Sequence, residues 1–228
     1  MREWGKTTLA LCALLACSGQ PRVRAVSLSA STTQVAVALG LADAVTPIDP
    51  RAPDALSRAL ASGTELVLAD GGADSADVRA LFASRNVAVR SFAPRTSDEV
   101  YGAYREIAAL LGEPRAGDAL AARVGGELER AAAKSGNGAR AKVALVLARR
   151  PLRVATGDAF LSKLLAAAGA DNAFAETAAT GSIEIRPEQL AERHARALDV
   201  PADLAATAWA DPNAATQRLR GALGDEPR

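Results

Sequence analysis

The feature that most constrains the fold of this chain is an alternation of short apolar runs with helical patterns from Arg24 onward. The apolar runs have the length of strands, and each is separated from the next by residues with helical periodicity. They lie at 24–28, 44–49, 65–69, 87–92, 142–148 and 152–156. Because this order is typical of sheets built from strand-helix-strand units, the sequence predicts the α/β class.

The alternation stops over residues 97–135, which contain two helical patterns and no strand-like run. A strandless segment of this length between two α/β regions favours a helical connector. We therefore expect a signal peptide over 1–16, an N-terminal α/β lobe over 22–95, a helical connector over 96–138 and a C-terminal α/β lobe over 139–228. The chain of 228 residues is long enough for two lobes, each with a core.

Several helix ends are predicted from capping residues. Ser31 with Gln34 has the spacing of a capping box, and Asp158 is expected to cap the helix that Gly169 ends. Pro187 is expected in the first turn of a helix that continues to about residue 198, and another helix is expected over 213–223.

The first twenty residues have the pattern of an export signal: charged residues, the apolar run TTLALCALLA and a small-residue junction. The stretch Leu14–Cys17 resembles a bacterial lipobox, which predicts lipidation of Cys17 and a membrane anchor. The alternatives are a simple secretory signal that ends at Ala16 and, with less support, a buried helix. Loss of residues 1–16 also removes Cys12, so no intramolecular disulfide would be available.

Composition excludes several functions. Lys and Arg number 27 and Asp and Glu 26, without a basic block, so we expect no nucleic-acid partner. His194 is the only histidine, which argues against a metal site of clustered histidines. The chain has no G-x-S-x-G elbow, and we expect neither catalysis nor a cofactor.

Three glycine- or hydroxyl-rich segments follow predicted strands and precede predicted helices: 29–32, 70–72 and 156–158. Ligands of open α/β sheets bind beyond the carboxyl ends of strands, where helix N-termini present free N–H groups. Phe160 and Trp209 could add aromatic walls. The expected ligand contacts are therefore Ser29, Ser31, Thr32, Asp70, Gly71, Gly72, Thr156, Gly157, Phe160 and Trp209. The alternative is that the segments are ordinary turns and the aromatic residues belong to the core.

The order of these pieces is similar to a known family. RAVSLSASTTQVAVALGLADAV, ELVLADGG, NVAVRSFAPRTSDEVYGAYREIAALLG, KVALVLARRPLRVATGDAFLSKLLAAAGADNAFAE and IRPEQLAER together resemble the periplasmic binding proteins of cobalamin, haem and ferric-siderophore ABC importers. The resemblance implies two Rossmann-like lobes joined by a long helix, with the ligand cleft between them. It implies a partner permease, and a cobalamin, ferric siderophore or haem as ligand.

In such proteins one surface carboxylate on each lobe docks on the permease. The matching positions are Glu188 in the second lobe and Asp74 or Asp77 in the first. Compared with the family, the loop between Asp49 and Pro53 is short, and the second lobe is expected to be trimmed after Glu192. The resemblance thus leaves a second hypothesis open: an accessory or interaction lipoprotein that no longer binds a small molecule.

Overall fold

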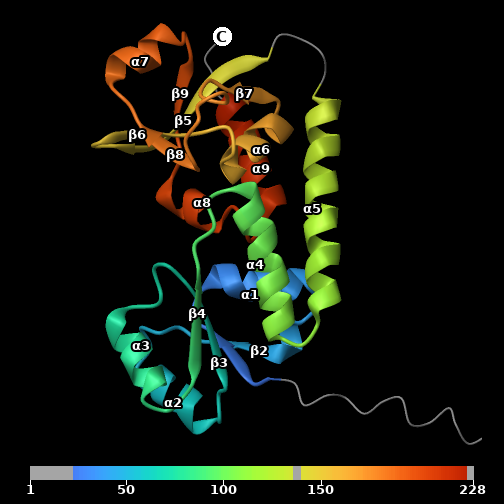
Figure 1. Ribbon diagram of the computed structural model, residues 1–228, viewed down its shortest axis with the longest axis vertical. Coiled ribbons are helices and arrows are strands. Elements are labelled where there is room, and N and C mark those ends of the chain that lie inside the picture. Colours follow the sequence, from blue (N-terminus) through green and yellow to red (C-terminus); the bar gives the residue numbers. More distant parts are fainter. Residues whose placement is uncertain (1–22, 136–139, 225–228) are drawn as a thin grey trace, which may run out of the picture.

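A computed structural model describes residues 23–135 and 140–224. The expected signal peptide and Cys17 lie outside the described residues. Figure 1 shows one sheet at each end of the molecule, with helix α5 running alongside both lobes. The α/β class and the two-lobe architecture predicted from the alternation of apolar runs are therefore confirmed.

The first sheet consists of four parallel strands in the order β2-β1-β3-β4. Its strands are β1 (Ala25–Ser27), β2 (Val45–Pro47), β3 (Leu66–Asp70) and β4 (Ala88–Phe92). Strand β3 is buried on both faces: Leu66 and Leu68 enter the main core, while Val67 and Ala69 pack with Val78 and Phe82 on the other face. This explains its uninterrupted apolar sequence.

The helices of this lobe connect the strands. They are α1 (Ala30–Ala38), the 3₁₀ turn η1 (Ala42–Ala44), α2 (Ala55–Ala61) and α3 (Ala76–Ala83). Helix α1 ends where Gly40 adopts a positive φ of 76°, as expected. The predicted cap Ser31 is wrong: Ser29 is the N-cap and accepts a hydrogen bond from Thr32 N, so Ser31 lies inside the first turn.

Two helices follow the first sheet, α4 (Ser97–Leu110) and α5 (Pro114–Lys134). Thr96 caps α4 in a capping box with Glu99, and Pro114 occupies the first turn of α5. The apolar stripe of α4, which includes Val100, Tyr104 and Ile107, is completely buried. These helices pack between the lobes and give the molecule one continuous main core.

The second sheet has the order β7-β5-β6-β8, with β9 paired to β5. Its strands are β5 (Ala141–Arg149), β6 (Leu152–Ala155), β7 (Ala170–Asn172), β8 (Ser182–Glu184) and β9 (Arg196–Asp199). Its helices are α6 (Phe160–Ala168), α7 (Pro187–Glu192), α8 (Ala202–Thr207) and α9 (Pro212–Gly224).

Strand β9 overturns one expectation. The sequence predicts one helix to residue 198, but α7 ends at Glu192 and His194 has a positive φ of 47°. The following residues then pair in parallel with β5 from Val143 to Val146. Arg196, Leu198 and Val200 are more buried than the residues between them, which is the two-residue period of a strand.

Candidate functional site

A cleft of about 1320 Å³ lies between the two lobes. Its first-lobe wall is formed by the segments that follow the carboxyl ends of all four parallel strands, at 28–34, 48–51, 71–75 and 93–95. Its second-lobe wall includes the start of α6, Gly181, Ser182 and the alanine-rich α8. The cleft thus occupies the place where open parallel sheets bind ligands.

At the start of α1 only the first of the three expected contacts lines the cleft. Ser29 is part of the wall, whereas Ser31 and Thr32 are at most 1% exposed. The Thr32 hydroxyl shares hydrogen bonds of 2.6 Å with Ser27 Oγ and 2.9 Å with Ser29 Oγ. These hydroxyls hold the beginning of α1 in place behind the cleft surface.

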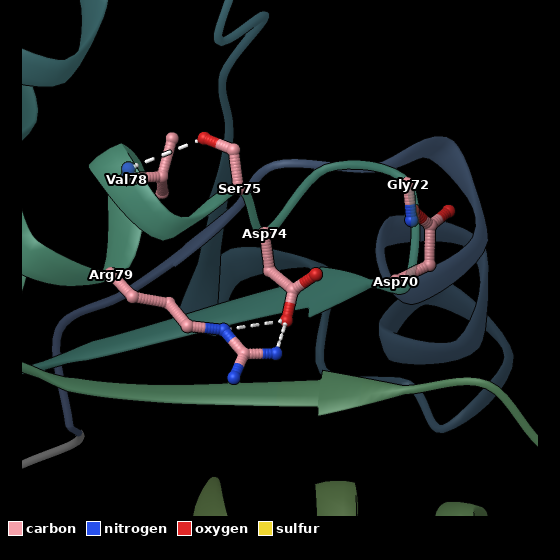
Figure 2. A network of polar contacts seen from close by, with 6 residues as sticks. All are labelled: Asp70, Gly72, Asp74, Ser75, Val78 and Arg79. Carbon is pink, nitrogen blue, oxygen red and sulfur yellow. Dashed lines mark hydrogen bonds and ion pairs between the residues drawn. The ribbon is translucent and has the colours of Figure 1, made fainter.

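The turn after β3 faces the cleft with all three expected residues, Asp70, Gly71 and Gly72. One Asp70 carboxylate oxygen accepts the Gly72 N–H at 3.2 Å, and the other accepts the Ser31 hydroxyl at 3.2 Å. Figure 2 shows the Asp70 carboxylate beside Gly72 in the turn that leads to α3. These hydrogen bonds stabilise the turn, and the two glycines are exposed in the cleft wall.

Asp74, which the resemblance places at the surface, is buried with only 9% exposure. Its carboxylate forms an ion pair with Arg79 and accepts the Arg79 Nε–H at 2.9 Å (Figure 2). Burial acts to raise the pKa of Asp74, but hydrogen bonds from Arg79 and Ser91 outweigh it and hold the pKa below its ordinary value. Asp77, in the first turn of α3, is exposed instead.

In the second lobe, Thr156 and Gly157 do not line the cleft among the described residues. Thr156 is fully buried. A Cβ at Gly157 would lie 2.0 Å from the carbonyl oxygen of Ala175, so glycine is required there by the close approach of a neighbouring segment.

Asp158 is not the N-cap of α6, because Ala159 occupies that position. The Asp158 carboxylate instead accepts the Thr156 hydroxyl at 2.7 Å and the Gly181 N–H at 2.9 Å. Desolvation acts to raise the pKa of Asp158, but these hydrogen bonds outweigh it and hold the pKa below its ordinary value. The side chain therefore ties the turn after β6 to the segment before β8.

The same turn is joined to the crossover from β4 to α4. Phe160 N–H donates to the carbonyl of Arg95 at 2.8 Å, Ser97 N–H donates to the carbonyl of Asp158 at 3.3 Å, and Thr96 forms an antiparallel bridge with Ala159. Main-chain bonds thus fix the second-lobe wall of the cleft against the end of the first sheet.

Phe160 and Trp209 line the cleft but are only 3% and 2% exposed. Trp209 stacks on Tyr104 with ring centroids 6.4 Å apart, and the Tyr104 hydroxyl donates to the Trp209 carbonyl. Burial raises the pKa of Tyr104 well above its ordinary value. The two aromatic rings are therefore core residues whose edges form part of the cleft wall.

Sequence reasoning missed three arginines in the lining, Arg51, Arg95 and Arg153. They come from three different segments, so no local spacing links them. The only available signal was that Arg51 and Arg95 follow shortly after predicted strands, whereas Arg153 lies within one.

The remaining candidate residues lie away from the cleft. Glu188 is exposed in the first turn of α7, and His194 is exposed just after that helix. Within residues 23–135 and 140–224, no group of three or more His, Cys, Asp or Glu side chains could hold a metal ion. None of the helices in these ranges is both long and apolar enough to cross a membrane.

Solved structures with this fold include periplasmic binding proteins for several ligands. A periplasmic vitamin B12-binding protein of Vibrio cholerae is 15% identical, with a TM-score of 0.54 over 89% of this chain and 97% of the other. A possible iron-binding periplasmic protein of Staphylococcus epidermidis is 15% identical, with a TM-score of 0.69 over 90% and 100%. A periplasmic haem-binding protein of Roseiflexus is 20% identical, with a TM-score of 0.58 over 90% and 98%.

No curated protein matches the sequence. A family model described as periplasmic binding protein matches residues 65–201, which is more than half of the chain. The match runs from the start of β3 through the helices between the lobes to the end of β9. On this match, together with the two-lobe fold and its cleft, the chain belongs to the periplasmic binding protein family.

Proposed function

We propose that this protein captures a cobalamin, ferric-siderophore or haem-type ligand between its lobes and delivers it to an inner-membrane ABC permease. The observation that carries the proposal is the cleft of about 1320 Å³ at the carboxyl ends of all four parallel strands. This volume exceeds that of sites for drug-sized molecules, about 300–1000 Å³, and suits a bulky ligand. The solved structures described above for vitamin B12, iron and haem support the same ligand classes.

Delivery requires a surface that the permease can recognise on each lobe. Glu188 and Asp77 are exposed carboxylates in the first turns of α7 and α3, one on each lobe. We assign docking to this pair, since the Asp74 carboxylate is buried and already paired with Arg79. The protein performs no catalysis in this scheme, and export with lipidation of Cys17 would keep it close to the membrane.

A thermal-shift titration tests the proposal. A ligand that binds only the folded protein stabilises it, by about 2.7 kcal/mol at a free concentration of 100 Kd. Cyanocobalamin, haemin and a panel of iron(III) siderophores are added to the purified protein, and at least one should raise the melting temperature in a saturable manner.

The absence of any shift would favour the second candidate, an accessory or interaction lipoprotein with the same fold. One observation favours that candidate: Thr156 and Trp209, both expected as ligand contacts, are at least 98% buried. The titration distinguishes the two functions because the melting temperature of an accessory protein would not depend on any of these small molecules.

A further inference from the structure

The interlobe cleft carries three exposed guanidinium groups on its wall. Arg51 follows β2, Arg95 lies between β4 and α4, and Arg153 lies in β6, so both lobes contribute. Within the described residues none of the three forms an ion pair within 4 Å; Arg153 donates to a neutral hydroxyl, Ser182 Oγ, at 2.7 Å. Their charges are therefore available to a ligand.

The acidic groups of the cleft neutralise this charge only in part. Asp49 and Asp70 are the only carboxylates in the described lining, and each already accepts hydrogen bonds. Asp49 accepts the Arg51 main-chain N–H at 2.9 Å, and Asp70 accepts the Ser31 hydroxyl and the Gly72 N–H. Three arginines against two aspartates leave the described lining with one unit of excess positive charge, carried by the side chains best suited to bidentate binding of carboxylates.

The lining also lacks the usual protein ligands of a transition metal. Among the described residues that line the cleft there is no His, Cys, Met or Tyr. Tyr104 lies outside the lining, and its buried hydroxyl donates to the Trp209 carbonyl. Imidazole, thiolate, thioether and phenolate ligands are thus absent from the wall, and its two carboxylates, Asp49 and Asp70, already accept hydrogen bonds. The wall therefore favours a metal whose coordination sites are filled by the ligand itself.

Part of the second-lobe wall is apolar. Helix α8 presents Ala202, Ala205 and Ala206, and α6 adds Phe160 and Leu161. These side chains can pack against the carbon framework of a ligand, and they place no requirement on the polar groups of that ligand.

Building on the proposed function, we infer that the ligand is an anionic molecule whose carboxylates bind Arg51, Arg95 and Arg153. Any metal in it is coordinatively saturated by the ligand's own donors. A carboxylate-type iron(III) chelate satisfies both conditions, whereas a haem that depends on an axial protein ligand does not.

Two saturated iron(III) complexes of opposite charge test the inference by isothermal titration of the full chain. The probes are iron(III)-rhizoferrin, which is anionic and bears carboxylates, and ferrioxamine B, which is cationic and uses hydroxamates; cyanocobalamin is a neutral reference. We expect the rhizoferrin complex to bind at least tenfold more tightly than either of the others. Arg51→Gln, Arg95→Gln and Arg153→Gln should each weaken it by about tenfold, the loss of one charge-assisted hydrogen bond.

Arg85→Gln is the matched control, because Arg85 is exposed in the first lobe and lies outside the cleft. Equal or tighter binding of ferrioxamine B or cyanocobalamin, or unchanged affinity in all three cleft variants, would overturn the inference but leave the proposed function standing. Haemin bound with the absorption spectrum of axially coordinated iron would also overturn it. If neither these three probes nor haemin bound, both the inference and the proposed function would fail.

Discussion

Replacement of Gly157 by alanine tests whether this glycine is needed for packing, rather than for the ligand contact expected from sequence. The new Cβ would lie 2.0 Å from Ala175 O, 2.8 Å from Ala175 C and 3.0 Å from Ala175 Cα. Since close carbon-oxygen contacts in proteins lie at about 3.3 Å or more, the two segments must separate by more than about 1 Å. Both opposing groups are backbone, so no side-chain rotation can relieve the overlap.

The separation also strains a neighbouring contact. Asn172 Nδ2 donates to the carbonyls of Ala155 at 2.9 Å and Thr156 at 3.2 Å, which link the same two segments. Overpacking costs about 1–3 kcal/mol, and loss of one hydrogen bond adds about 1 kcal/mol. We therefore expect Gly157→Ala to lower the free energy of unfolding by about 3 kcal/mol, a large part of the about 5–15 kcal/mol typical of a domain.

Urea unfolding followed by circular dichroism measures this loss. For a protein of this size about 3 kcal/mol also corresponds to a fall of roughly 6–12 °C in melting temperature. Gly126→Ala is the matched control: Gly126 lies inside α5 with open space at its Cβ position, so alanine should stabilise the helix by about 0.5–1 kcal/mol. A Gly157→Ala protein that unfolds at the wild-type urea concentration would refute the packing argument.

Three further predictions concern the pH dependence of stability, docking on the permease and the membrane anchor. Because the pKa of Asp74 is lowered in the folded state, its stabilising contribution is complete above its ordinary pKa and is lost as pH falls through the folded value. Asp74→Asn should therefore flatten the fall in the free energy of unfolding on acidification below about pH 4, measured by urea unfolding at several pH values. An unchanged slope would contradict this role of Asp74. Glu188→Arg should leave ligand affinity unchanged but impair uptake in cells. Glu176→Arg, at another exposed carboxylate of the same lobe that lies outside the cleft lining, is the control, and normal uptake by Glu188→Arg would remove Glu188 from the docking surface. Cys17→Ser should move the protein from the membrane fraction to the soluble fraction, and a wild-type protein that is already soluble would exclude the anchor.

The alternation of apolar runs predicted the fold well because buried parallel strands leave a local signal. The sequence of β3, for instance, is apolar on both faces. Strand β9 was missed because its residues are only partly buried and its pairing with β5 lies about fifty positions away in sequence.

Local patterns were less informative about the candidate site. The sequence places several polar residues near each helix start, and only the folded backbone decides which of them is the cap. Ser29 rather than Ser31 caps α1, and Asp158 binds Gly181 rather than the first turn of α6. The burial of Asp74 beside Arg79 and the convergence of the cleft arginines depend on tertiary packing, which spacing along the chain does not encode.

The fluorescence of Trp209 tests ligand capture in the cleft most directly. In a Trp4→Phe chain Trp209 is the only tryptophan, and it lies in the cleft wall. Cyanocobalamin, haemin and iron(III)-rhizoferrin absorb light and quench a nearby indole, and free N-acetyltryptophanamide corrects for absorption by the probe itself. The proposed function predicts saturable quenching by at least one of them, and quenching no greater than that of the free indole with all three would contradict it.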